Sequence, residues 1–115
     1  MTVSNSDKVQ IGTSDLAKSL MNSEVLASFF HEQRDMIKFA VAVAISKNLA
    51  PVFSEPTMTN AQHTQGLDKD GSLADLVRHY QKTSTPYRES EALAEAGFRY
   101  LSDHFDKGGE LDDLF

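Results

Sequence analysis

The regular spacing of apolar residues near the end of the chain constrains the fold most. Thr85-Pro86 resembles a helix cap followed by proline at the first helical position, and Gly108-Gly109 resembles a helix stop. Between these two pairs, apolar residues and one histidine recur at steps of three and four: Leu93, Ala96, Gly97, Tyr100, Leu101, His104 and Phe105. This spacing predicts a long helix that buries one stripe against other elements.

The charged residues of this predicted helix are expected on its other face. We expect Glu89, Glu91 and Glu95, with Arg88 and Arg99, to face water. Glu95 and Arg99 have the spacing and order of a stabilising i, i+4 ion pair. A solvated helix face therefore explains these residues without a catalytic role.

The segment 31–48 is the most apolar part of the chain. Its large apolar residues alternate with alanine from Phe39 to Ile45, which by itself is typical of a strand. Good helix formers before this run, the alanines within it and Pro51 after it favour a buried helix that ends near Asn48. A helix that is apolar on several faces is either central or covered by a partner subunit, so Val41 and Val43 become candidate contacts of a homo-oligomer.

Shorter segments complete the predicted fold. Thr13 and Ser14 can cap a helix that runs to about Met21, and apolar residues to Phe30 continue it or form a second helix. Another helix is expected from Ser72 to Lys82, and residues 51–71 are expected to form a polar loop or to hold a short helix at 57–65. The predicted fold class is all-α: a bundle of about four helices with one long polar loop over residues 1–109, to which a short N-terminal strand can be added, and an acidic and apolar tail at 110–115.

The uneven charge argues against strong binding to nucleic acid. Residues 1–50 hold as many basic as acidic side chains, so the second half carries all of the net charge of −6. Such a half repels phosphate, and direct contact with nucleic acid is expected to be weak. No apolar run is long enough to span a membrane, and the first residues lack the pattern of a secretory signal, so we expect a cytoplasmic protein.

Catalytic and metal-binding motifs are incomplete in this sequence. His31-Glu-Gln-Arg-Asp35 lacks the second histidine of a zinc-protease helix, and Asp68-Lys-Asp70-Gly71-Ser72 lacks the spacing of a calcium loop and fits a turn before a capped helix. The chain has no cysteine, and its glycines form no phosphate-binding loop. We therefore expect no enzyme activity, no cofactor and no metal.

Two short segments are candidates for binding. If residues 8–11 form a strand, the order of strand and two helices matches a ribbon-helix-helix repressor, with Lys8 and Gln10 as the residues that contact DNA. The C-terminal tail offers Leu111, Leu114 and Phe115 within an acidic sequence similar to short recognition peptides. The alternative for the tail is a frayed terminus.

A wider pattern of residues resembles one family of accessory proteins. It comprises Phe30, Asp35, Phe39-Ala40, a polar loop with proline, Leu73-Ala-Asp-Leu76, and Glu91-Ala-Leu-Ala-Glu-Ala-Gly97-Phe with Leu101. This order looks like the small helical accessory proteins of DNA phosphorothioation (Dnd) systems. The resemblance implies an accessory protein of a prokaryotic DNA-modification or defence system.

These observations lead to one functional expectation and two alternatives. We expect a non-enzymatic accessory protein that binds a protein partner and forms homo-oligomers through the helix at 31–48. The first alternative is a ribbon-helix-helix-like DNA-binding regulator. The second is an acidic inhibitor of a nucleic-acid-binding partner, which uses the carboxylates of the second half.

Overall fold

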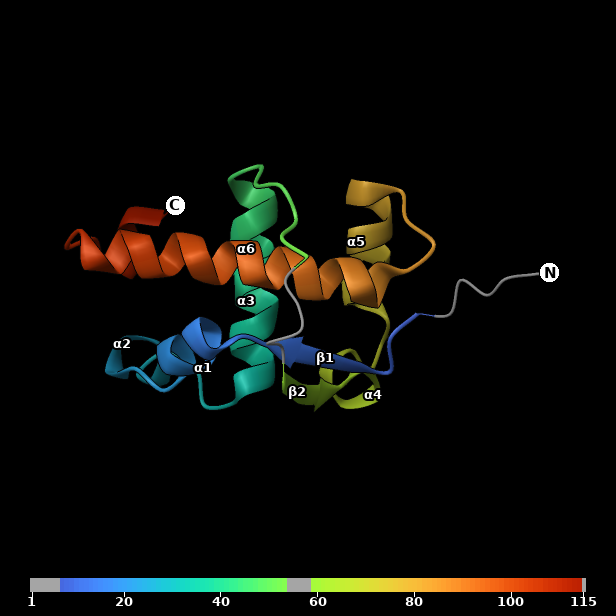
Figure 1. Cartoon of the computed structure of the whole chain (residues 1–115), viewed down its shortest axis with the longest axis horizontal. Coiled ribbons are helices and arrows are strands. Elements are labelled where there is room, and N and C mark those ends of the chain that lie inside the picture. The colour runs from blue at the N-terminus through green and yellow to red at the C-terminus, as the bar shows by residue number, and fades with distance from the viewer. Residues whose placement is uncertain (1–6, 54–58, 115) are drawn as a thin grey trace.

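The computed structural model describes residues 7–53 and 59–114, and it is mainly helical with one small sheet (Figure 1). This confirms the predicted helical class and the N-terminal strand. In chain order the elements are β1 (Gln10–Thr13), α1 (Asp15–Met21), α2 (Glu24–Ala27), α3 (Gln33–Ser46), β2 (Thr59–His63), α4 (Thr64–Leu67), α5 (Ser72–Gln81), α6 (Pro86–Asp106) and the 3-10 helix η1 (Leu111–Leu114). Within the described residues, no helix is both long and apolar enough to cross a membrane.

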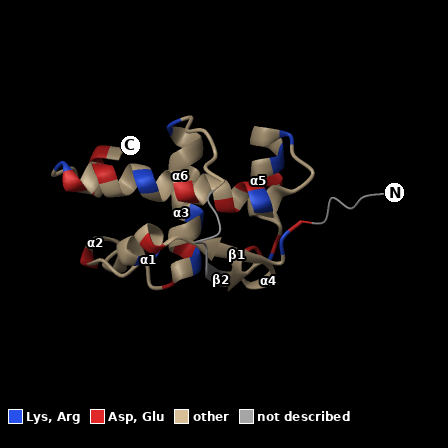
Figure 2. Cartoon of the chain, in the orientation of Figure 1, with Lys and Arg blue, Asp and Glu red and all other residues tan. Residues whose placement is uncertain are grey.

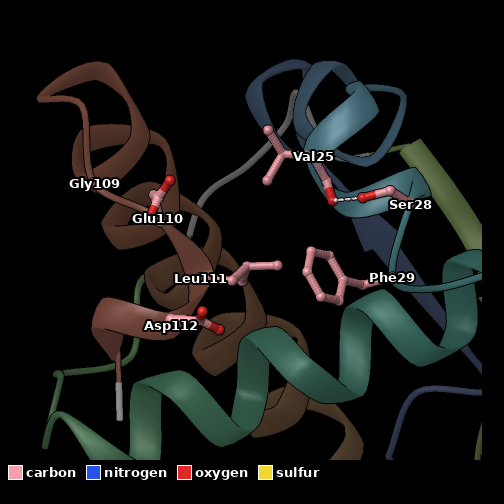
Figure 3. A pocket seen from close by; sticks show the side chains of 7 residues that line it. All are labelled: Val25, Ser28, Phe29, Gly109, Glu110, Leu111 and Asp112. Carbon is pink, nitrogen blue, oxygen red and sulfur yellow. Dashed lines mark hydrogen bonds between the residues drawn. The ribbon is translucent and has the colours of Figure 1, made fainter.

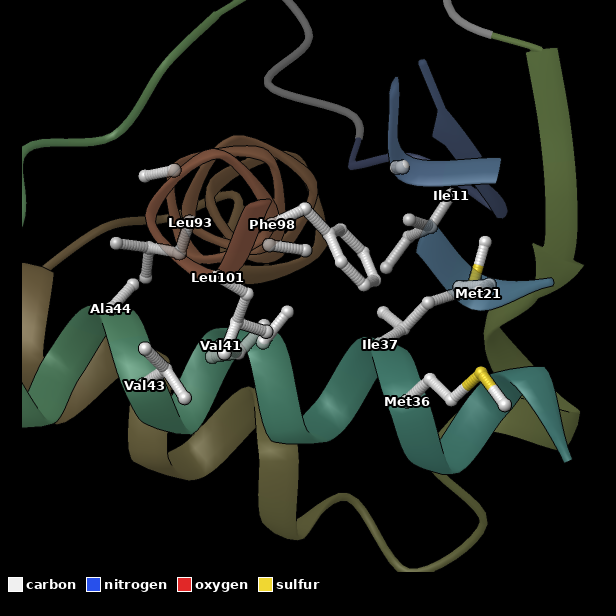
Figure 4. Packing of buried hydrophobic residues seen from close by; sticks show 14 of the residues in the cluster. Ile11, Met21, Met36, Ile37, Val41, Val43, Ala44, Leu93, Phe98 and Leu101 are labelled. Carbon is white, nitrogen blue, oxygen red and sulfur yellow. The ribbon is translucent and has the colours of Figure 1, made fainter. Parts of the chain in front are cut away.

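The long helix α6 crosses α3, and this crossing organises the core (Figure 1). Gly97 of α6 lies directly on the backbone of α3, where a Cβ atom would overlap the carbonyl oxygen of Ala40. Around this contact, the apolar side chains of both helices interdigitate with Ile11 and Met21 from the N-terminal segment (Figure 4). The predicted long helix and the predicted helix at 31–48 are both confirmed. The second of them ends at Ser46, and Asn48 just after it has a left-handed backbone, φ 56°.

Val41 and Val43 lie inside this core. Both side chains are 0% exposed in the single chain, so no partner subunit is needed to cover them (Figure 4). The expectation that these two valines contact a second subunit is therefore wrong, because the chain's own helices surround α3. The alternative of a central helix is the one that the structure shows.

The small sheet departs from the sequence-based expectation. β1 lies two residues later than the expected strand at 8–11, and it pairs antiparallel with β2, with an irregular register between Ile11 and Gly12. β2 and α4 occupy the segment expected to be a loop or a helix at 57–65. Four of the five residues of β2 are polar, and they show no alternating pattern, so their pairing with β1 rather than their own sequence determines the strand.

Side-chain caps explain where several helices begin. Ser14 accepts a hydrogen bond from the Ala17 N–H, and Ser23 starts α2 as a separate helix. The start of α5 at Ser72 is confirmed, and the side chain that caps it comes from the preceding turn. Asp68, which is buried, accepts hydrogen bonds from the backbone N–H groups of Leu73 and Ala74 at 2.9 and 3.0 Å.

The N-terminal segment packs along α6 and covers carboxylates that were expected to face water. Glu91 accepts hydrogen bonds from Lys8 Nζ and from the Gly12 N–H, both at 2.6 Å. Glu95 is 2% exposed and binds the Ser14 hydroxyl at 2.7 Å and Arg99 Nε at 2.8 Å. The predicted ion pair of Glu95 is confirmed, whereas the solvated face is wrong for both glutamates because the N-terminal strand and α1 lie against them.

Candidate interaction groove

The clearest candidate site is a groove between α2 and the C-terminal segment (Figure 3). It has a volume of about 320 Å³, which is at the small end of the range for ligand pockets. Val25 and Phe29 form one wall, and Leu111 forms the facing wall, with its side chain directed toward the Phe29 ring. The remaining lining residues are Ser28, Gly109, Glu110 and Asp112.

The turn after α2 directs Phe29 outward. The backbone N–H groups of Phe29 and Phe30 both donate to the carbonyl oxygen of Leu26, and these bonds form a tight turn at the end of α2. The Leu26 side chain itself is buried. Phe30 then packs on Phe39, with ring centroids 5.1 Å apart, whereas Phe29 is left 63% exposed. The groove therefore has a large aromatic side chain that the fold does not cover.

The C-terminal segment is held in place as the second wall. The Glu110 carbonyl oxygen lies 2.8 Å from His104 Nε2, and the Glu110 N–H donates to Asp113 at 2.9 Å. Leu114 is buried in the core, and Leu111 packs partly against it. The predicted tail therefore folds back onto α6, so Leu114 is not free to act as a recognition residue. The third candidate of the tail, Phe115, lies outside the described residues.

The charges of the groove are negative. Glu110 and Asp112 are exposed acidic side chains, and the residues that line the groove include no lysine or arginine. Acidic residues are frequent over the end of α6 and η1 as a whole (Figure 2). The groove thus combines an apolar centre with an acidic margin.

The predicted DNA-contacting residues lie elsewhere. Lys8 is engaged by Glu91 within the same chain, and Gln10 is exposed at the start of β1. Because β1 pairs with β2 of its own chain, the structure does not bring Lys8 and Gln10 together on a free strand of the kind that ribbon-helix-helix dimers pair between subunits.

Motifs with possible metal ligands have structural roles. Asp68 caps α5 and also accepts a hydrogen bond from the Tyr87 hydroxyl at 2.9 Å, as expected for a turn before a capped helix. Burial and this hydrogen bond raise the pKa of Tyr87 to about 12. Hydrogen bonds from the Ser72 side chain and backbone lower the pKa of Asp70. Across residues 7–53 and 59–114, no three histidine, aspartate or glutamate side chains gather in a way that could hold a metal ion.

Comparisons with protein-family models, curated proteins and solved structures gave no match. The candidate site therefore rests on the geometry of this chain. Sequence reasoning identified Leu111 but did not single out Phe29. The available signal was the pair Phe29-Phe30, because a short turn can bury only one of two adjacent large side chains.

Proposed function

We propose that the protein is a non-enzymatic accessory protein that binds a protein partner through the groove between α2 and η1. The observation that carries this proposal is Phe29, a 63% exposed phenylalanine opposite Leu111. Large aromatic residues contribute strongly to binding when a partner removes them from water. A protein side chain inserted between Phe29 and Leu111 would bury both walls at once.

The shape of the groove favours a macromolecular partner over a small ligand. A pocket for a small ligand encloses most of the ligand's surface, whereas this groove is small and partly open to solvent. Val25, which is 41% exposed, extends the apolar surface from the groove onto α2. The contact that fits this surface is one or two apolar side chains that project from a larger protein.

The test is site-specific photo-crosslinking in the native host. A photoreactive phenylalanine analogue is placed at Phe29 in one variant and at Phe53 in a matched control. Phe53 is similarly exposed, at 60%, but it does not line the groove. We expect a discrete adduct with another protein from position 29 and none of the same mass from position 53.

Two results would contradict the proposal. One is the absence of any heteromeric adduct from position 29, and the other is the same set of adducts from both positions. In each case Phe29 would be an ordinary exposed residue, and the groove would not be the binding surface.

The cellular setting is a separate part of the proposal, and it rests on the sequence resemblance to the Dnd accessory proteins. If the protein belongs to a DNA-modification or defence system, its crosslinked partner should be encoded in the same locus as such enzymes. A partner from an unrelated locus would contradict this setting without affecting the role of the groove.

A further inference from the structure

We infer that the groove accepts a basic amphipathic segment of its partner, in which a large apolar side chain is flanked by lysine or arginine. This inference rests on the proposed function and adds the chemistry of the partner. The apolar centre is Val25, Phe29 and Leu111, and the acidic margin is Glu110 and Asp112.

The two carboxylates of the margin are available to a partner. Two other carboxylates of α6 are already paired: Asp103 binds Lys107 at 2.9 Å, and Glu95 binds Arg99. By contrast, the side chains of Glu110 and Asp112 have no basic partner among the residues that the structure describes. Both are exposed, so a cation can approach them without breaking an existing ion pair.

The positions of these two carboxylates determine which residues should flank the apolar side chain of the bound segment. Glu110 and Asp112 flank Leu111 in sequence, and both line the same groove as its side chain. An apolar side chain that contacts Leu111 and Phe29 therefore places its neighbouring residues next to carboxylates. Lysine or arginine at those neighbouring positions gains attraction, whereas aspartate or glutamate there is repelled.

The same charges disfavour two other occupants. Nucleic acid would bring phosphate groups against Glu110 and Asp112, and none of the described residues that line the groove is a lysine or arginine that could neutralise them. A second copy of this chain would bring a molecule with a net charge of −6 against an acidic surface. Neither has the charge complementarity of a basic segment.

The experiment is a selection of displayed peptides against the purified full-length protein. A random library of peptides of about 12 residues, long enough for one amphipathic helix, is selected on the wild type. It is then counter-selected on Phe29→Ser, so that only peptides that need the groove remain. Phe53→Ser, which removes an equally exposed phenylalanine outside the groove, is the control for folding and nonspecific adhesion.

We expect the remaining peptides to carry a large apolar residue with lysine or arginine on both sides. Their affinity should fall about three- to tenfold for the double variant Glu110→Gln with Asp112→Asn, as is typical when exposed charge pairs are removed. The matched variant Asp15→Asn with Asp35→Asn removes two exposed charges outside the groove and should leave the affinity within about twofold of the wild type.

The outcomes separate the two proposals. Groove-dependent peptides that are neutral or acidic, or an affinity that does not respond to Glu110→Gln with Asp112→Asn, would overturn the basic segment and leave the proposed function standing. If no peptide distinguishes the wild type from Phe29→Ser, the groove is not a peptide-binding surface, and both proposals fail.

Discussion

Gly97 lies where α3 and α6 cross, and the position of a side chain there is already occupied by the backbone of Ala40. Backbone atoms cannot rotate away as a flexible side chain can. Adding even one methyl group at this position must therefore push the two main helices of the core apart.

We predict that Gly97→Ala lowers the free energy of unfolding by about 2–3 kcal/mol, because overpacking at a rigid contact separates the helices. Chemical denaturation measures this loss. Gly66→Ala is the matched control, since a Cβ atom at Gly66 of α4 meets nothing within 4 Å. Equal stabilities of the two variants would show that the helices do not approach as closely as described.

Tyr87 makes stability sensitive to alkaline pH. Its pKa is raised to about 12, chiefly by burial and then by the hydrogen bond to Asp68, so the folded state favours the neutral hydroxyl. An unfolded tyrosine ionises near pH 10. The stabilisation from the neutral hydroxyl is therefore complete below about pH 10 and is lost as the pH rises toward 12.

We predict that Tyr87→Phe removes part of the loss of stability between about pH 10 and 12. At neutral pH the same variant should be less stable by about 1.5–3 kcal/mol, because it loses one hydrogen bond to a carboxylate. Thermal melts of the wild type and the variant across this range measure both effects. An unchanged difference between the two proteins at all pH values would contradict the assignment.

At the scale of elements, α3 shows what its sequence could and could not predict. The flanks of the alanine-rich run predicted a helix correctly, but its many apolar faces allowed either a central helix or one covered by a subunit. Only the packing of α6 and its neighbours around α3 decides between them, and that packing depends on long-range contacts with no local signal.

We predict that Val41→Glu prevents folding rather than dissociating an oligomer, because it places a charge in the core. Val43→Ala, a milder change, should cost about 2 kcal/mol. Ala42 lies on the exposed side of the same helix, so the variant Ala42→Glu should fold with a nearly unchanged melting temperature. Sedimentation and circular dichroism of the variants test this prediction. A folded, monomeric Val41→Glu variant would contradict it and support the expectation that α3 contacts a second subunit.

Some helix caps can be recognised from the local sequence, whereas other caps and the strand pairing depend on residues that are distant in the sequence. Ser14 caps its own helix and is recognisable from sequence, as are the start of α5 and Pro86 in the first turn of α6. The N-terminus of α6, however, is bound by Asp7, whose carboxylate accepts from the Tyr87 and Arg88 N–H groups at 2.7 and 2.9 Å. No spacing rule joins residues so far apart, and the same holds for the pairing of β2 with β1.

At the scale of the whole molecule, the net negative charge disfavours binding to nucleic acid. The net charge is −6, and Lys8, which the sequence suggested as a DNA contact, is bound to Glu91. The Glu91 carboxylate is largely buried, so it needs this cation and the Gly12 N–H as partners.

We predict that the protein does not bind duplex DNA at micromolar concentration near physiological salt, as measured by fluorescence anisotropy. Lys8→Ala should leave this result unchanged and should instead lower stability by about 1–2 kcal/mol, because Glu91 loses its charged partner. Salt-sensitive DNA binding that Lys8→Ala abolishes would favour the repressor-like alternative.

The bonds from Asp7, Lys8, Gly12 and Ser14 to α6 span 79 to 83 positions of the chain. A ribosome therefore releases the first strand long before it makes the helix that this strand binds. Until α6 emerges, β1 has none of its partners on that helix, and Ile11 has no complete core to enter. The contacts between β1 and α6 can therefore form only after α6 has been synthesised, and such long-range contacts give slower folding than local helix contacts alone would give.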